Sequence, residues 1–257
     1  MNHPSSPEVV SLYRYPIKGL SPQKLDQLAL TAGETVPGDR AYAIENGPGR
    51  FDPENPRYLP KINFLMLMRN ERLAALETTF DDATQTLTIS RGGKQVTQGT
   101  LTSKLGRQII EQFIAGYMKD ELKGPPRIVS APAHSFSDVA AKCLHLVNLA
   151  TVRDLEVAVG MTLNPLRFRA NVYFDGPEPW QEKQWLGRHL SIGGVRFKVT
   201  SETVRCDATN VNPDTAERDG TIPPTLQRIF GSPCLGIYAK VVDGGEIRPG
   251  DRVEAHA

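Results

Sequence analysis

The sequence has few cysteines and no long apolar segment, and both shortages narrow what the protein can be. Its three cysteines, Cys143, Cys206 and Cys234, lie far apart and cannot form a closed set of disulfides. We therefore expect a reduced, intracellular protein whose thiols remain available for chemistry. The longest apolar run, Phe64–Met68, falls far short of the roughly 20 residues that cross a bilayer, so we expect no membrane contact.

Charge of one sign is also lacking, because 30 lysines and arginines face 29 aspartates and glutamates and leave a net charge of +1. That balance argues against a dominant surface for nucleic acid, although it leaves room for a local basic pocket. The first residues lack a basic region followed by an apolar stretch, so we expect no secretory signal and a cytoplasmic location. The sequence has no P-loop, C-x-x-C or H-E-x-x-H motif, so nucleoside triphosphate, zinc and iron–sulfur sites of these kinds lack support.

What is present predicts a β-rich α+β protein of two parts. The length of 257 residues fits one large or two small domains, and Gly124–Pro126 is the best linker. We therefore expect domains at 8–124 and 125–257. The front part has short β-prone stretches joined by turns, which favours a barrel or sandwich. Its expected strands are Val9–Tyr15, Asp26–Thr31, Arg40–Glu45, Ile62–Met68, Leu73–Thr79 and Thr84–Ser90.

A few short helices complete the expected fold. Apolar spacing predicts a helix over Leu105–Tyr117, with Thr102 or Ser103 as its N-cap. A capping-box pattern predicts a second helix over Thr151–Val159. Pro223–Phe230 begins with prolines, as first helical turns tolerate. The expected strands of the back part are Leu144–Leu149, Asn171–Asp175, Leu190–Ile192, Val195–Arg205, Leu235–Val242 and Arg252–Glu254.

Cys206 is the first candidate for chemistry, because it lies where a β-rich stretch breaks into a polar loop. A thiol beside a cation such as Arg205 favours the thiolate, which is a nucleophile and a soft metal ligand. The alternative is a buried cysteine that acts as a small hydrophobe, which is the commoner case and the one we expect for the other two cysteines. A thiol–base pair of Cys206 with His145 or His189 is a further alternative.

Four basic residues form a second candidate site. Arg167 and Arg169 flank Phe168, and in an extended segment their side chains would share one face. Paired guanidinium groups suit a phosphate or carboxylate, although a salt bridge to an acidic residue or a solvated edge is the commoner outcome. Lys18 follows the first expected strand and Arg40 begins the third. Together these cations would line an anion pocket if the strand ends converge.

Several segments match, in order along the chain, the motifs of one known family. Arg205–Thr215, R-C-D-A-T-N-V-N-P-D-T, resembles the cysteine motif R-C-x-x-T-x-V-D-P-x-T-G of MOSC-domain proteins. Arg167–Asn171 is similar to that family's R-F-R-P-N, and Gly236–Val253 is similar to its closing pattern. Tyr15–Gly19 and Gly38–Arg40 resemble the N-terminal domain of the mitochondrial amidoxime-reducing component and its bacterial relatives. The resemblance implies a MOSC-type β-barrel behind a smaller, β-barrel-like N-terminal domain.

The resemblance also implies a molybdenum pyranopterin cofactor, whose dithiolene binds the metal while a protein cysteine adds a further ligand. The matching position is Cys206, and a soft, anionic thiolate suits that role. Basic residues hold the phosphate of the cofactor in the family. The matching positions are Lys18, Arg40, Arg167 and Arg169, with Asn171 as a neutral hydrogen-bonding partner and Thr151, at the expected helix start, as a further contact.

The implied activity is an oxidoreductase that reduces N-hydroxylated small molecules and releases the oxygen as water. The sequence shows no four-cysteine ferredoxin domain of the kind that some relatives carry, so we expect a separate protein to donate the electrons. The alternative is a carrier of the cofactor or of sulfur, in which Cys206 bears a persulfide and no substrate turns over. A thiol enzyme without a metal is the third alternative.

Overall fold

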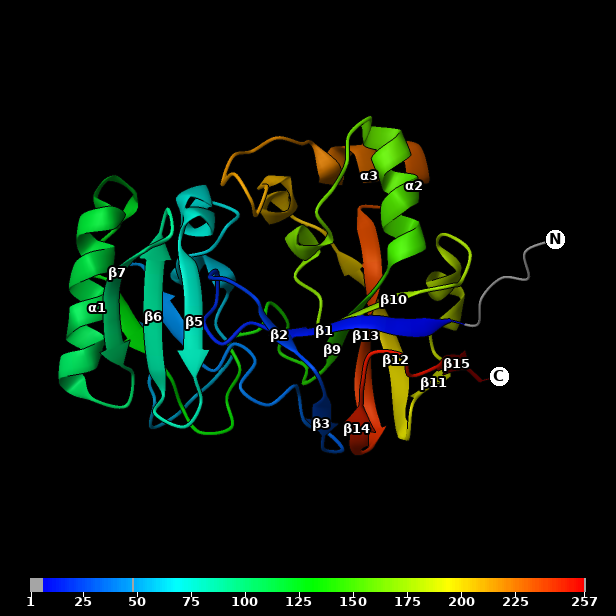
Figure 1. The fold of residues 1–257 in the computed structure, drawn as a ribbon, viewed down its shortest axis with the longest axis horizontal. Coiled ribbons are helices and arrows are strands. Elements are labelled where there is room, and N and C mark those ends of the chain that lie inside the picture. Colours follow the sequence, from blue (N-terminus) through cyan, green and yellow to red (C-terminus); the bar gives the residue numbers. More distant parts are fainter. Residues whose placement is uncertain (1–6, 48, 257) are drawn as a thin grey trace.

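The largest sheet of the molecule is built from both ends of the chain. The computed structural model describes residues 7–47 and 49–256, which form two bodies side by side (Figure 1). Eight strands form the sheet in the order β15-β11-β12-β13-β9-β10-β1-β2. Their bounds are β1 (Glu8–Arg14), β2 (Gln23–Leu25), β9 (Leu144–Asn148), β10 (Val172–Asp175), β11 (His189–Ile192), β12 (Val195–Val204), β13 (Cys234–Asp243) and β15 (Val253–Ala255).

This sheet curls into a barrel-like form, because β1 meets the residues around β15. The Val9 amide donates to the Asp251 carbonyl at 2.9 Å, and the Val253 amide donates to the Pro7 carbonyl at 2.8 Å. These bonds satisfy backbone groups that an open edge would leave unpaired. Buried side chains from the strands fill the interior, and we call this part the barrel body.

Two helices cover one side of the barrel body. β9 and β10 are parallel, so the chain must cross over between them. The crossover contains α2 (Leu149–Val159), which packs with α3 (Ile222–Phe230) on a separate apolar cluster. The segments that lead into β9 and β10 and the loop that follows β12 carry residues that line one cavity together with residues 61–68 of the second body.

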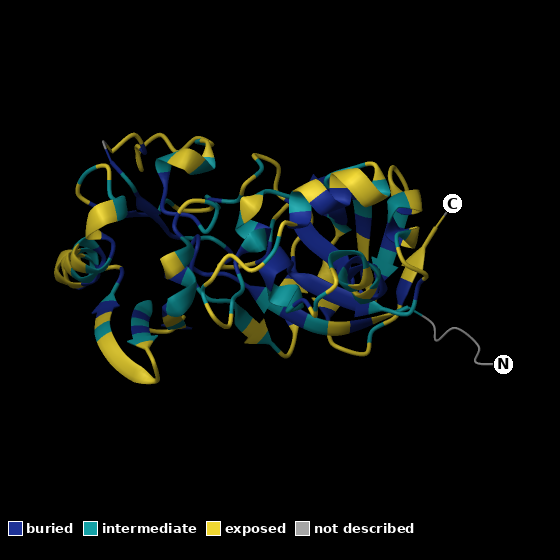
Figure 2. Cartoon of the chain, turned by 90° about the horizontal axis from the view of Figure 1, so that it is seen from above, coloured by how far each residue is buried: buried dark blue, intermediate teal, exposed yellow. Residues whose placement is uncertain are grey.

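The second, smaller body is built on a three-stranded meander with one helix packed on it. Buried residues gather in each body separately, and the outward side of the helix is exposed (Figure 2). Its elements are β4 (Ala43–Glu45), β5 (Glu77–Asp81), β6 (Thr86–Arg91), β7 (Lys94–Thr100), α1 (Lys104–Tyr117) and β8 (Arg127–Val129), where β4 pairs with β8.

The chain passes between the two bodies more than once. β1 and β2 join the large sheet, and β3 (Leu28–Leu30) pairs with β14 (Gly245–Ile247) beside it. β8 lies beyond residue 124 in the sequence, yet it pairs with β4 in the small body. Neither body is therefore made from one uninterrupted stretch of chain.

The β-rich α+β fold is confirmed, and most of the expected strands lie at or near their expected bounds. The tight turn between β6 and β7 is present, and Ser103 caps α1 by accepting a hydrogen bond from the Gly106 amide at 3.0 Å. None of the helices in the described part of the chain is long and apolar enough to cross a membrane.

The expected strand Ile62–Met68 is wrong, and the expected strand Leu73–Thr79 is correct only from Glu77, where β5 begins. Lys61–Asn63 and Glu71–Ala75 are short 3-10 helices, and the apolar run between them is irregular although it is largely buried. The Asn70 side chain accepts a hydrogen bond from the Met66 amide at 3.1 Å, so this backbone group needs no strand partner. A short apolar run indicates burial, but it does not by itself distinguish a strand from a packed loop.

The start of α2 is also corrected. The Asn148 side chain accepts a hydrogen bond from the Ala150 amide at 3.0 Å and is the N-cap. Thr151 therefore lies within the first turn and does not begin the helix. Asn148 is fully buried at the end of β9 and also donates to Glu182 at 3.1 Å, an interaction that the local sequence does not reveal.

Two glycines of α1 give a matched test of how closely this helix packs on β7. A Cβ on Gly106 would lie 2.2 Å from the Thr100 carbonyl oxygen, whereas one on Gly116 would meet nothing within 4 Å. We expect Gly106→Ala to lower the free energy of unfolding by about 2 kcal/mol, because the helix must move away. Gly116→Ala should raise it by about 0.5 kcal/mol, because alanine favours the helix. Chemical denaturation of both variants measures this contrast, and equal effects would contradict the close packing.

Candidate functional site

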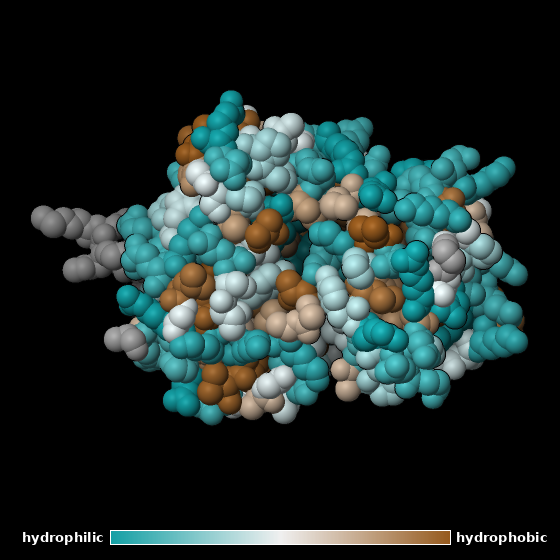
Figure 3. Space-filling model, turned by 180° about the vertical axis from the view of Figure 1, so that it is seen from behind, coloured by the Kyte–Doolittle hydropathy of each residue, from teal (hydrophilic) through white to brown (hydrophobic). Residues whose placement is uncertain are grey.

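A cleft of about 380 Å³ lies between the two bodies and has Cys206 in its lining. We call it the cysteine cleft. The surface is hollowed between the bodies when seen from behind (Figure 3). Of the residues that the sequence points to, all except Thr151 meet in this lining. They are Cys206, Lys18, Arg40, Arg167, Arg169 and Asn171.

Cys206 follows β12 and begins a short 3-10 helix over Asp207–Asn210. Its carbonyl accepts hydrogen bonds from the amide and the hydroxyl of Thr209, both at 2.9 Å, which fixes the turn. The thiol is half-buried and faces Lys61 of the small body, whose Nζ lies 3.2 Å from Sγ. The turn and the ammonium group together determine where the sulfur lies.

Lys61 belongs to a row of alternating charges along the cleft. Its ammonium group also donates to Asp138 Oδ2 at 3.2 Å, and Asp138 pairs through Oδ1 with the buried Lys18. Lys18 donates in addition to the Phe136 carbonyl at 2.8 Å. Burial lowers the pKa of Lys18, and Asp138 partly offsets this. Burial would raise the pKa of Asp138, but the two ammonium groups hold it well below its usual range.

Two arginines share the ring of Tyr15. The guanidinium carbon of Arg169 lies 4.2 Å from the ring centroid, and that of Arg40 lies 4.6 Å from it. Arg40 pairs with Asp39 and donates through Nη2 to the Arg169 carbonyl at 3.1 Å. Both arginines have positive φ angles, 50° for Arg40 and 53° for Arg169, which are strained for residues with a side chain. Both guanidinium groups thus lie against one aromatic ring, which is a favourable contact for each cation.

The lining of the cleft contains hydrogen-bond donors without acceptors. Arg169 Nη2, Arg205 Nε and Arg167 Nε are buried and have no partner among the described residues. A buried donor of this kind costs about 1–3 kcal/mol unless a ligand or water accepts from it. Burial also lowers the pKa of Arg169 to about 10. An anionic group in the cleft would offset both costs.

Arg167 and Arg169 do not share one face, which corrects the extended interpretation of their segment. Pro165–Phe168 is a 3-10 helix, and Arg169 follows it in the left-handed region. Arg167 turns to Asp219, with Nη1 and Oδ1 3.0 Å apart, and donates to the Thr209 carbonyl at 3.1 Å. Arg167 thus forms a salt bridge and stabilises the turn Cys206–Thr209, which we call the cysteine turn.

Asn171 and Thr151 have their polar groups engaged by the protein. Asn171 Oδ1 accepts from the His145 amide at 3.1 Å, and Nδ2 donates to the Tyr13 carbonyl at 3.2 Å, which links β9 to β1. The Thr151 hydroxyl is buried within α2 and donates to Glu182 Oε1 at 2.9 Å. Asn171 therefore lines the cleft as part of its frame, and Thr151 does not reach it.

The geometry does not support a thiol–base pair of Cys206 with His145 or His189. His145 is buried in the lining, with Nε2 3.3 Å from Arg205 Nη1, and His189 lies in β11. Within residues 7–47 and 49–256, no hydrogen bond joins either histidine to Cys206. Burial and two nearby arginines hold the pKa of His145 well below its usual range, so it is neutral at physiological pH.

Two residues of the cleft lining, Lys61 and Asp138, and the buried Tyr15 beside it were not predicted as site residues from the sequence. Lys61 begins the 3-10 helix that replaces an expected strand, and Asp138 lies in a loop without a motif. Tyr15 begins the segment Tyr15–Gly19, which resembles the family, and this resemblance is the one feature of the sequence that points to it. Lys61 and Cys206 are 145 residues apart in sequence and meet only through the packing of the two bodies.

The pairing of Lys18 with Asp138 gives a test of the buried charge. Asp138→Asn leaves the Lys18 ammonium group without its counter-ion, so we expect the free energy of unfolding to fall by about 2 kcal/mol at neutral pH. This is less than the roughly 3–5 kcal/mol of a fully buried pair, because Asp138 is partly exposed. A Lys18→Met/Asp138→Asn double variant should recover most of the loss, and a further fall in stability would contradict the account.

The same pair predicts a pH dependence. Because the pKa of Asp138 in the folded protein lies below its ordinary value of about 3.9, its stabilisation is fully present above that value. The stabilisation is lost progressively as the pH falls through the folded pKa. Denaturation measured from neutral to acidic pH should therefore show the wild type and Asp138→Asn converging in acid.

Comparison with known proteins gives two domain matches that follow each other along the chain. Residues 6–122 match the MOSC N-terminal beta barrel domain, and residues 131–254 match the MOSC domain. Mitochondrial amidoxime reducing component 2 of Rattus norvegicus is 30% identical over 122 residues, which are 43% of this chain and 36% of that protein. Molybdenum cofactor sulfurase of Drosophila willistoni is 34% identical over 110 residues, which are 42% of this chain and 14% of that protein.

The similarity to solved structures is weaker. The match to the YUAD protein from Bacillus subtilis covers 98% of this chain and 97% of that chain, with a TM-score of 0.44 and 13% identity. The match to the curated relatives also spans well under half of their length. The domain matches suffice for the family: the chain belongs to the MOSC-domain proteins, with a MOSC N-terminal β-barrel domain in front of its MOSC domain.

Proposed function

We propose that the cysteine cleft holds a molybdenum pyranopterin cofactor through the Cys206 thiolate and that the protein reduces N-hydroxylated small molecules. The observation that carries the proposal is a half-buried thiol in the same cleft as buried arginine donors that lack acceptors. One relative is named for amidoxime reduction and another for molybdenum cofactor sulfuration. Both names agree with a function associated with this cofactor.

The residues of the cleft fit the chemistry of such a group. Its phosphate would accept hydrogen bonds from Arg169 Nη2 and Arg205 Nε, and charge-assisted bonds of this kind are the strong ones. A thiolate is a soft ligand and suits a metal that brings its other sulfur ligands with an organic cofactor. The volume of about 380 Å³ lies within the range of about 300–1,000 Å³ that is usual for small-molecule pockets.

The bound cofactor would supply two-electron redox chemistry coupled to oxygen-atom transfer. The overall reaction is R–NHOH + 2 e⁻ + 2 H⁺ → R–NH₂ + H₂O, with the electrons supplied by a separate electron-donor protein. The residues of this chain would bind and orient the cofactor. Lys61 holds the Cys206 sulfur from the small body, and Arg167 braces the turn that carries it. Arg40 and Arg169 keep a fixed positive charge against Tyr15, which fits an anionic ligand.

A second candidate function is a carrier of sulfur, with a persulfide on Cys206. It is favoured by the similarity to the molybdenum cofactor sulfurase, which falls in a stretch of about a hundred residues of this chain. The carrier would bear sulfur that cyanide releases, and it would turn over no N-hydroxylated substrate. The same cleft would serve both functions, because a persulfide also needs an accessible, positioned sulfur.

The test is the molybdenum content of protein made in a host that synthesises the cofactor. We expect close to one molybdenum per wild-type chain and a loss of at least about tenfold in Cys206→Ala, because the protein ligand is gone. Cys234→Ala is the matched control, since Cys234 is buried outside the lining of the cleft, and it should keep its molybdenum. Reduction of benzamidoxime by a reduced viologen dye should follow the metal content.

Two outcomes would overturn the proposal. Molybdenum retained in Cys206→Ala would remove the cysteine from the metal site. Folded wild-type protein without molybdenum, but with cyanide-releasable sulfur that disappears in Cys206→Ala, would establish the carrier in its place.

A further inference from the structure

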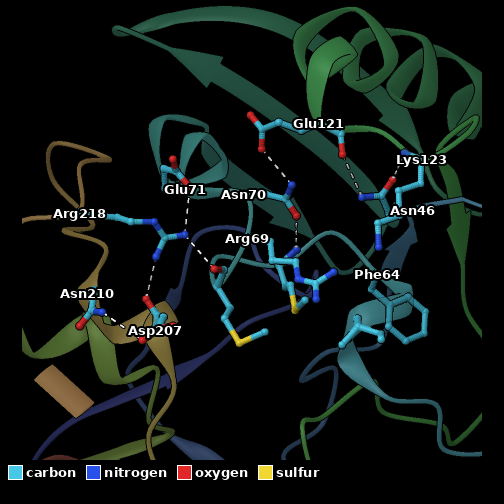
Figure 4. Close-up of a pocket in the computed structure, with 13 residues that line it drawn as sticks. Asn46, Phe64, Arg69, Asn70, Glu71, Glu121, Lys123, Asp207, Asn210 and Arg218 are labelled. Atoms are coloured by element: carbon cyan, nitrogen blue, oxygen red, sulfur yellow. Dashed lines mark hydrogen bonds and ion pairs between the residues drawn. The ribbon is translucent and has the colours of Figure 1, made fainter. Parts of the chain in front are cut away.

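A second cavity, of about 660 Å³, shares lining residues with the cysteine cleft, and Figure 4 shows its lining. We call it the side pocket. Met66 and Met68 line both cavities. Asp207 also lines the side pocket, and it follows Cys206 directly in the chain, so their Cα atoms are about 3.8 Å apart. A molecule that reacts in the cleft therefore has the side pocket as its nearest further space.

One wall of the side pocket is fixed by Arg218. Its Nη1 donates to the Asp207 carbonyl at 3.0 Å in the cysteine turn, and its Nη2 donates to the Met68 carbonyl at 2.9 Å in the small body. Nη2 also lies 3.0 Å from Glu71 Oε2. Arg218 thus joins the two bodies across the pocket, and its own charge is already paired.

The acidic groups of the small-body wall are also engaged. Glu121 Oε2 accepts from Asn70 Nδ2 at 2.9 Å, and Glu121 Oε1 lies 3.7 Å from Arg72. Glu71 is paired with Arg218. The carboxylates of this wall are therefore not free to attract a cationic ligand.

Two cations of the side pocket differ from these, because their charged groups have no partner in the part of the chain that the structure describes. Arg69 makes no side-chain hydrogen bond or ion pair there, and Lys123 is held only through its backbone amide, which donates to Asn46 at 2.8 Å. Figure 4 shows Lys123 beside Asn46 and Arg69 between Asn70 and Phe64, with Arg218, Glu71 and Asp207 across the pocket. Glu121 lies near these two cations but is engaged by Asn70 and Arg72. The positive charge without a partner among the described residues therefore lies away from Arg218.

Apolar side chains also line the side pocket. Phe64 and Met66 are buried, Ile62 is exposed, and Met68 adds apolar lining next to Arg218. Small-molecule sites usually combine an apolar lining with a few placed polar groups. A planar guanidinium beside an apolar surface suits a carboxylate on an aromatic or aliphatic body, because it can bind both carboxylate oxygens.

We propose that the side pocket binds the non-reacting part of the substrate and that Arg69 and Lys123 select substrates that carry a carboxylate on an apolar body. The inference rests on the proposed reduction of N-hydroxylated compounds in the cysteine cleft. It names Arg69 and Lys123 as specificity-determining residues, which act on substrate binding and not on the metal.

The experiment compares benzamidoxime with 4-carboxybenzamidoxime on the molybdenum-loaded protein. The wild type should have the higher kcat/KM for the carboxylated probe, mainly through a lower KM. Arg69→Gln and Lys123→Gln should each reduce the ratio of the two kcat/KM values by about fivefold, as expected for partly exposed ion pairs, and the double variant by about 25-fold, because independent effects multiply. Arg69→Lys should keep most of the preference, because the charge remains.

Lys94→Gln is the matched control, since it removes an equal charge from the β6–β7 turn, outside the pocket. It should leave the ratio as in the wild type. A ratio that is equally high in the wild type and in the double variant would overturn the inference while leaving the reductase function in place.

The absence of turnover with both probes would count against the proposed function, and calorimetry on the same proteins would then decide the inference alone. Tighter binding of 4-carboxybenzamidoxime than of benzamidoxime, weakened in Arg69→Gln and Lys123→Gln, would support the pocket. Equal binding of the two probes to the wild type would overturn it.

Discussion

The positive charge buried around Cys206 is the constraint on which the rest of the site depends. Arg40 and Arg169 stack on one ring and Lys18 is buried, while Asp39 pairs with Arg40 and Asp138 pairs with Lys18. Desolvated cations are costly, and two of these residues also have strained backbones. The architecture keeps them because strands and loops from both halves of the chain fix each one. An anion in the cleft would offset part of this cost.

The passage of the chain between the bodies explains how this site is held together. β1 pairs with β10 in the barrel body, and the loop that follows β1 carries Lys18 toward the small body. Lys61 reaches the Cys206 sulfur from the opposite direction, and Arg218 reaches back from the barrel body to Met68. The thiol, the cations and the side pocket therefore come into place only when both bodies are folded and in contact. Loss of either body removes part of the site.

Much of this could be predicted from the sequence, where the signal was local. Period-two alternation located most of the strands, and family-like motifs brought out Cys206, Lys18, Arg40 and Arg169, which do meet in one cleft. Cys143 and Cys234 are buried, as expected. Tertiary packing decided the remainder. Lys61 and Asp138 carry no motif, Arg167 turned to Asp219 once its segment proved helical, and Asn148 took the cap expected of Thr151. For Lys61, Asp138 and Arg167 the deciding partner lies far away in the sequence, where periodicity and spacing carry no information, whereas the Asn148 cap is a local interaction that the capping-box pattern misplaced.

The central claim is that Cys206 and the unpaired arginine donors hold one and the same ligand. A crystal structure of the protein purified from a cofactor-producing host, with anomalous data collected at the molybdenum edge, tests it most directly. We expect a molybdenum peak within bonding distance of Cys206 Sγ and a phosphate that accepts hydrogen bonds from Arg169 and Arg205. A molybdenum peak away from Cys206, or a cofactor whose phosphate leaves both arginines unpaired, would contradict it.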